Sequence, residues 1–147
     1  MFDTERMVTL PAPTMAPVRV LIVDDGFQSR WGIADWLTAF LAPVAVDSAA
    51  SPREALAAIA KRRPDLVLAA HPMRNADGIE LARRIKSQDN PPAVVVMTDT
   101  WDAQFESACD AAGADFWLEK RHLQARLLAF LQRRFSHRVL RQTVPLP

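Results

Sequence analysis

Short apolar segments alternate along this chain with longer segments of helical periodicity, and this alternation limits the possible folds more than any other feature. The short segments are rich in Val, Ile and Leu, as strands are. The longer ones place apolar residues three or four positions apart, as helices with one buried face do. Strands that are apolar throughout are typical of a parallel sheet covered by helices on both faces. The predicted strands are residues 18–23, 44–46, 66–70, 93–97 and 116–118, and the predicted helices begin near residues 28, 52, 78, 101 and 122.

This pattern predicts one α/β domain, a doubly wound (βα)5 parallel sheet that spans residues 18–135. The last helix is expected to run to about residue 140, so residues 136–147 form a basic C-terminal extension of it. Residues 1–17 contain three prolines and little periodicity, and we interpret them as an extended leader. The single cysteine excludes an internal disulfide.

Polar side chains follow several of the predicted strands at the point where each strand ends. Asp24 and Asp25 come directly after the first strand, Thr98 follows the fourth, and Lys120 closely follows the fifth. In an open parallel sheet these ends meet at one edge, where the working site lies. Carboxylates are ligands for Mg²⁺, and a hydroxyl and an ammonium can bind phosphoryl oxygens. The sequence therefore predicts a site suited to a divalent cation and a phosphoryl group.

The sequence resembles the receiver domain of response regulators, the proteins of two-component signalling and phosphorelays. The resemblance covers about residues 18–135 and implies a flavodoxin-like fold with strand order 2-1-3-4-5. It depends on residues 20–25 (VLIVDD), residues 64–68 (PDLVL), Asp77-Gly78, Thr98 and residues 112–120 (AGADFWLEK), which occur in the order and at the spacing of the family.

The resemblance implies a role for each residue at the predicted site. Asp24 and Asp25 match the acidic pair that helps to bind Mg²⁺, and Thr98 matches the hydroxyl that follows the phosphoryl group. Lys120 matches the lysine that contacts this group, and Trp117 takes the place of the switch aromatic residue. The phosphoacceptor position, an Asp in the family, is Ala70 here. A methyl group can neither accept a phosphoryl group nor bind a metal.

Three further positions near the site depart from the family pattern. Arg74 replaces a proline, Asp99 replaces a small residue beside Thr98, and Arg121 replaces the proline after the lysine. We expect Asp99 to belong to a vestigial acidic pocket with Asp24 and Asp25. Several departures around one site favour natural loss of the acceptor, and the alternative is an acceptor Asp that was mutated to Ala at position 70.

Each site residue also has a purely structural interpretation. Asp24 and Asp25 could pair with Lys120 to neutralise it, and a one-sided pair of carboxylates is a weak Mg²⁺ site. Thr98 could be a helix cap. Trp31 and Trp36 lie on different faces of the first helix, so one of them is a candidate partner contact.

The formal net charge of +1 is the sum of two opposed blocks. Residues 1–119 contain 11 basic and 17 acidic side chains, whereas residues 120–147 contain 7 basic and none that are acidic. In the receiver family the face built from the fourth helix, the fifth strand and the fifth helix is the usual partner surface. Here these are the segments that begin near residues 101, 116 and 122. The helix from residue 101 is acidic and the helix from residue 122 is basic, which would pair opposite charges across a two-fold axis in a homodimer. The interface candidates are Asp102, Glu106, Asp110, Arg126, Arg133 and Arg134.

These observations predict a stand-alone receiver that acts by protein–protein contact, without phosphorylation and without enzymatic activity. Its partner would be a histidine kinase, another regulator or a second copy. Nucleic-acid binding through the basic C-terminal helix is a weaker alternative, because the net charge is close to zero and no recognition motif is present. No apolar run is long enough to span a membrane and no secretory signal is evident, so a cytoplasmic location is expected.

Overall fold

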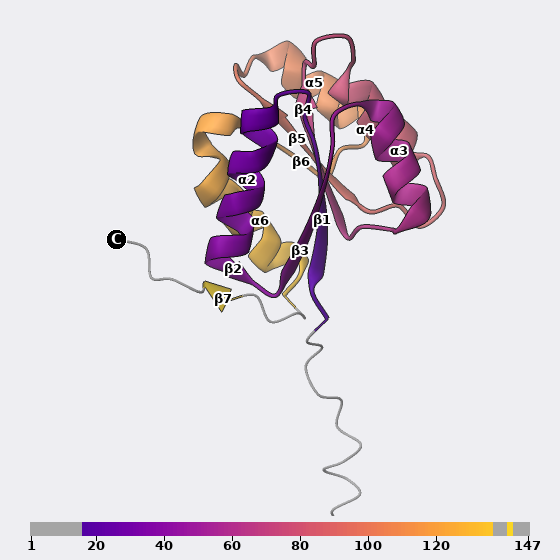
Figure 1. The fold of residues 1–147 in the computed structure, drawn as a ribbon. Coiled ribbons are helices and arrows are strands. Elements are labelled where there is room, and N and C mark those ends of the chain that lie inside the picture. The colour runs from indigo at the N-terminus through magenta and orange to yellow at the C-terminus, as the bar shows by residue number, and fades with distance from the viewer. Residues whose placement is uncertain (1–15, 137–140, 143–147) are drawn as a thin grey trace, which may run out of the picture.

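The computed structural model describes residues 16–136 and 141–142, and a five-stranded parallel sheet forms its centre (Figure 1). The spatial order of the strands is β3-β1-β4-β5-β6, which confirms the predicted order 2-1-3-4-5 when the strands are counted along the chain. The strands are β1 (Val18–Val23), β3 (Val44–Ala49), β4 (Leu66–His71), β5 (Ala93–Thr98) and β6 (Phe116–Glu119).

Helices cover both faces of this sheet and run antiparallel to its strands (Figure 1). All six residues of β5 are buried, which explains why the central strands are apolar without alternation. None of the described helices is long and apolar enough to cross a membrane. The helices are α2 (Phe27–Phe40), α3 (Pro52–Lys61), α4 (Gly78–Lys86), α5 (Ala103–Ala112) and α6 (Leu123–Arg134), with a 3₁₀ turn η1 (Lys120–His122) before α6.

The starts of three helices are fixed by capping side chains. Ser51 accepts a hydrogen bond from the Glu54 amide at the start of α3, and the Glu54 carboxylate accepts one from the Ala50 amide in return. Asp77 caps α4 and Asp102 caps α5 in the same way. These caps place each helix directly after the strand end that precedes it.

The chain after α6 differs from the prediction. The helix ends at Arg134 instead of continuing to about residue 140, and the buried Phe135 closes its last turn. The Phe135 amide still donates to the Leu131 carbonyl oxygen, but the backbone of Phe135 has left the helical conformation. Arg141 and Gln142 form a short strand, β7, antiparallel to β2 (Leu41–Ala42). The predicted leader, apart from residues 16–17, and residues 137–140 and 143–147 lie outside the described residues.

Candidate functional site

Asp24 is the centre of a buried ion pair at the carboxyl end of β1. Its side chain is only 4% exposed, and its Oδ2 accepts a hydrogen bond from Lys120 Nζ at 2.7 Å. Oδ1 accepts from the Gly26 amide at 2.9 Å, and Lys120 also donates to Ser29 Oγ at 3.2 Å. Arg30 reaches back from α2 to the Asp24 carbonyl oxygen at 2.7 Å. The end of β1, the first turn of α2 and the start of η1 are therefore joined by one polar network.

This network keeps Asp24 ionised. Burial alone would raise the pKa of Asp24, but the hydrogen bonds from Lys120, Ser29 and the Gly26 amide, together with the charge of Lys120, lower it below its ordinary value of 3.8. Lys120 thus neutralises Asp24, as the structural interpretation of these residues predicted. Ser29 and Arg30 were not predicted from the sequence, although their positions in the first turn of the following helix place them next to the strand end.

Asp25 has a different partner from Asp24, although the two residues are adjacent. It is exposed, and its Oδ2 accepts a hydrogen bond from the Arg74 amide in the loop after β4. The structure therefore pairs only Asp24 with Lys120. Asp25 instead ties the loop after β1 to the loop after β4.

Ala70 lies next to the end of β4, where the resemblance places the phosphoacceptor. It is 2% exposed and is paired in register with Met97 of β5. The first residue of α4, Gly78, packs against it so closely that a Cβ on Gly78 would lie 2.0 Å from the Ala70 carbonyl oxygen. Glycine is required at this position because any side chain would collide with the backbone of β4.

The donor set at this edge does not fit a Mg²⁺ site. The Asp24 carboxylate is bound to a lysine, the Asp25 carboxylate to a backbone amide, and Ala70 has no side-chain oxygen. Within the described part of the chain, no three His, Cys, Asp or Glu side chains are grouped so that they could hold a metal ion. To bind Mg²⁺, the Asp24 carboxylate would have to exchange the Lys120 ammonium for the metal.

Thr98 ends β5 and is buried, but it does not cap a helix. Its hydroxyl donates to the Thr100 carbonyl oxygen and accepts from the Thr100 amide, which closes the turn after β5. Asp102 caps α5, so the interpretation of Thr98 as a helix cap is wrong. Asp99 is exposed, and no hydrogen bond or ion pair within the described residues joins it to Asp24 or Asp25.

Trp117 lies in β6 and is held by contacts on several sides. Its ring stacks on Trp101 at a centroid distance of 6.1 Å and meets the Phe105 ring at a steep angle at 5.9 Å. The Arg126 guanidinium of α6 lies 5.5 Å from the Trp117 ring centroid and 5.0 Å from that of Phe116. This aromatic cluster joins α5, β6 and α6 into one surface.

The predicted interface residues belong to α5 and α6, two helices that both contact β6, and they are not paired with one another in the described part of the chain. Asp102 is used as the cap of α5, Glu106 is partly exposed, and Asp110 is exposed near the end of that helix. Among the described residues, no ion pair joins these acids to the basic residues of α6. Arg133 and Arg134 are exposed in the last turn of α6.

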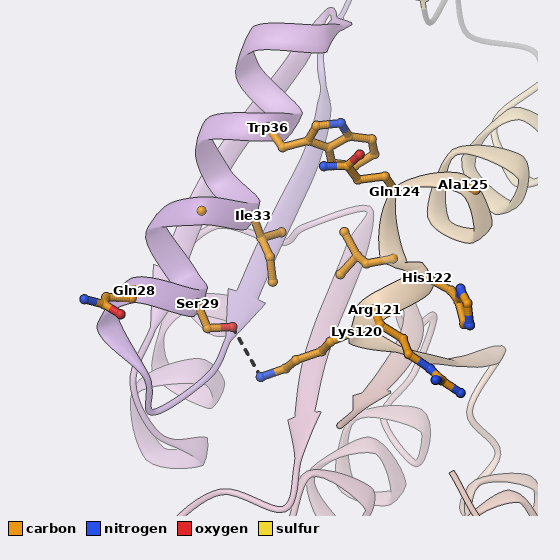
Figure 2. A pocket seen from close by; sticks show the side chains of 11 residues that line it. Gln28, Ser29, Ile33, Trp36, Lys120, Arg121, His122, Gln124 and Ala125 are labelled. Atoms are coloured by element: carbon orange, nitrogen blue, oxygen red, sulfur yellow. Dashed lines mark hydrogen bonds between the residues drawn. The ribbon is translucent and has the colours of Figure 1, made fainter. Parts of the chain in front are cut away.

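A cavity of about 610 Å³ lies between α2 and the start of α6, beside the Asp24–Lys120 pair (Figure 2). Ile33 and Trp36 line it from α2, and residues 120–125 line it from the other side. Figure 2 shows Lys120 extending past this cavity to Ser29. Trp36 is buried, whereas Trp31 is 64% exposed, so Trp31 is the tryptophan of α2 that is free to meet a partner.

Sequence comparison identifies related proteins in bacteria. A family profile described as the response regulator receiver domain matches residues 20–132. Response regulator MprA of Mycolicibacterium vanbaalenii is 35% identical over 121 residues, which cover 80% of this chain and 52% of MprA. Response regulator protein VraR of Staphylococcus aureus is 34% identical over 105 residues, which cover 70% of this chain and 49% of VraR. The chain therefore spans about half the length of these relatives.

Solved structures show the same fold. Chemotaxis protein CheY4 of Vibrio cholerae superposes with a TM-score of 0.71 at 32% identity, over 80% of this chain and 98% of CheY4. A putative response regulator of Chloroflexus aurantiacus superposes with a TM-score of 0.74 at 26% identity, over 82% of this chain and 99% of that protein. Fold, motif order and sequence identity agree, and the chain belongs to the family of response regulator receiver domains.

Proposed function

We propose that this receiver domain acts in two-component signalling through protein–protein contacts and is not phosphorylated. The observation that carries the proposal is the buried methyl group of Ala70 at the phosphoacceptor position. A phosphoryl transfer to a receiver needs a carboxylate nucleophile there, and a methyl group has no lone pair to attack the phosphorus. The domain would have no chemistry of its own.

The contacts of the other site residues support the same proposal. Lys120 donates to Asp24 and Ser29, and the Thr98 hydroxyl donates to Thr100, so a phosphoryl oxygen would have to compete with these contacts. Trp117 is held by Trp101, Phe105 and Arg126. Because these contacts hold the Trp117 side chain on several sides, they favour a single conformation over a switch between two.

The exposed aromatic side chains favour a protein as the partner. Phe27 and Trp31 lie one turn apart on α2 and are 70% and 64% exposed. Aromatic side chains of this kind are common anchors of protein interfaces. A histidine kinase or another regulator in the cytoplasm is the partner that we propose for this surface. A second copy is the partner that we propose for the face formed by α5, β6 and α6, where Trp101 is 43% exposed.

The second candidate function is a phosphorylatable receiver whose acceptor was replaced at position 70. The position of the other site residues favours it, because Asp24, Thr98 and Lys120 all lie at the edge where a phosphoryl group would bind. Comparison of this sequence with the genomic one distinguishes a natural alanine from an introduced one.

The experiment that tests the proposal is incubation with acetyl phosphate and Mg²⁺, followed by intact-mass measurement at neutral and acidic pH. We expect no phosphoryl adduct on the wild-type chain. The matched variant Ala70→Asp supplies the missing nucleophile, and an adduct on it would show that the rest of the site is competent. No adduct on a folded Ala70→Asp chain would show that the loss extends beyond this residue. A phosphoryl group on an aspartate of the wild-type chain would overturn the proposal.

A further inference from the structure

Basic side chains gather at the edge of the sheet where the strands begin, opposite the candidate site. Because the helices run antiparallel to the strands, their C-terminal ends all point to this edge (Figure 1). We call the group formed at the ends of α3 and α6 the basic edge. Its members, all exposed, are Lys61, Arg62, Arg63, Arg133 and Arg134.

The two halves of the basic edge meet around a shallow pocket of about 330 Å³. Arg63 and Arg134 both line it, although they are far apart in the sequence. Arg63 Nη1 donates to the Asn90 carbonyl oxygen at 3.3 Å, and the Arg134 guanidinium lies 5.6 Å from the centroid of the Phe135 ring. Among the described residues, the contacts that position these two guanidinium groups are therefore with neutral partners.

No member of the basic edge forms an ion pair within the part of the chain that the structure describes. Three acidic side chains lie near it. Asp115 is one of them: its carboxylate accepts a hydrogen bond from the Val94 amide beside the pocket and is paired with Lys86. Asp65 lines the same pocket and accepts a hydrogen bond from the Arg19 amide, and Asp89 is exposed in the loop after α4. Cations in the last turn of a helix complement its dipole, which explains Lys61 at the end of α3 and Arg133 and Arg134 at the end of α6. It does not explain Arg62 and Arg63, which follow the last residue of α3.

The net charge of the chain does not describe the field at this edge. The candidate site, with its acidic residues, lies one strand length away, about 20 Å for the six residues of β1. Exposed charges are screened beyond about 8 Å at physiological ionic strength. An anion near the basic edge would therefore experience its five cations and only a small part of the charge at the other edge.

The composition of the basic edge favours a polyphosphate over a protein. Four of its five members are arginines, whose planar guanidinium groups bind phosphate oxygens in pairs. A protein interface usually has apolar or aromatic anchors at its centre. The exposed large apolar side chains among the described residues, Phe27, Trp31 and Trp101, belong to α2 and to the turn before α5, not to the basic edge.

We propose that the basic edge binds the phosphate backbone of double-stranded nucleic acid without sequence preference. The net charge of +1 argues against such binding, but the fold gathers five cations at one edge, and this local charge favours it. The sequence suggested only the basic C-terminal helix as a nucleic-acid-binding surface. In the fold, the end of α3 contributes as much to the basic edge as α6 does. Contacts to phosphates alone give no sequence information, and they weaken steeply as the salt concentration rises.

Fluorescence anisotropy with a labelled DNA duplex of random sequence, measured over a series of salt concentrations, tests this proposal. If all five cations contact phosphates, the logarithm of the binding constant falls with the logarithm of salt with a slope of about −4 to −5. The variant Arg63→Gln/Arg134→Gln is expected to reduce this slope by about 2. The variant Arg62→Gln/Arg133→Gln should also reduce the slope by about 2. Unlike Arg63 and Arg134, these two side chains make no hydrogen bond or ring contact with the described residues, so the variant removes charge alone.

The matched control is Arg53→Gln/Arg74→Gln, which removes the same charge near the opposite edge, from exposed side chains. Its slope and affinity should equal those of the wild type. The proposal is overturned if the wild-type chain does not bind the duplex at low salt, or if the control loses as much affinity as the edge variants. Binding to phosphatidylserine vesicles with no binding to the duplex would also overturn it.

Discussion

Lys120 is the residue that decides the chemical state of the site. In a receiver with its acceptor, this lysine faces a carboxylate at position 70, and here that carboxylate is absent. Lys120 binds Asp24 instead and satisfies a side chain that is almost completely buried. The ion pair therefore stabilises this edge of the sheet.

Replacement of Lys120 by methionine should destabilise the fold. Lys120→Met leaves the buried Asp24 carboxylate without its cation, which costs about 3–5 kcal/mol for fully buried pairs. We expect about 2 kcal/mol here, because the Lys120 side chain is 25% exposed. Urea denaturation of the two proteins measures the difference in the free energy of unfolding.

Asp24→Asn and the double variant are the controls for this prediction. If the two side chains act as a pair, the double variant loses less stability than the sum of the single variants. The pH dependence should agree. The pKa of Asp24 is lowered in the folded state. Its contribution to the free energy of unfolding is therefore fully present above pH 3.8 and is lost as the pH falls through the lowered pKa. A difference between wild type and Asp24→Asn that persists in strong acid would contradict this role.

The sequence predicted most of the site residues but fewer of their contacts. Asp24, Thr98 and Lys120 could be found because strand ends meet at one edge. The different partners of Asp24 and Asp25 could not, because they depend on how the loop after β4 approaches β1. Such an approach is set by packing between segments far apart in the sequence.

At the scale of elements, the position of α4 depends on one glycine. Gly78 starts this helix directly against the Ala70 carbonyl oxygen, and Asp77 caps it by accepting hydrogen bonds from two amides of its first turn. The start of α4 and the end of β4 are therefore in contact. A shift of α4 would move the segment that borders the acceptor position.

Gly78→Ala should destabilise the domain, whereas Gly32→Ala should stabilise it. The new Cβ at residue 78 would meet a backbone oxygen at 2.0 Å, and we expect a loss of about 3 kcal/mol because backbone cannot yield as a side chain can. At residue 32, in the middle of α2, a Cβ meets nothing within 4 Å, and alanine should add about 0.5–1 kcal/mol. Thermal unfolding of both variants measures the two effects, and equal changes in the same direction would refute the argument.

Helix starts were easier to predict than helix ends. Ser51, Pro52 and Glu54 form a local signal that predicted the start of α3, and the structure confirms it. The end of α6 has no such signal, because the basic residues after Phe135 are compatible with a helix or a loop. The end of α6 at Arg134 is therefore a property of the folded molecule.

At the scale of the molecule, the folded chain redistributes the charges that the sequence shows in two blocks. The sequence separates an acidic body from a basic C-terminal part at Lys120. The fold brings a basic residue at the end of α3 to the end of α6, where Arg63 and Arg134 line one pocket. The strand order was predictable from the family resemblance, but these surfaces depend on which side chains remain exposed.

The surface formed by α5, β6 and α6 leads to the last prediction, which concerns assembly. In a two-fold symmetric dimer through this face, Glu106 of one copy would approach Arg126 of the other. Sedimentation velocity should show a weak dimer, and Glu106→Arg or Arg126→Glu should each weaken it by about tenfold, as like charges meet. Arg126 also stacks on Trp117 of its own chain. Weaker dimerisation of Arg126→Glu could therefore come from a lost contact across the interface or from a lost contact within the chain. The combined charge swap separates them: it restores dimerisation if the pair acts across the interface and does not restore it if Arg126 acts only within its own chain.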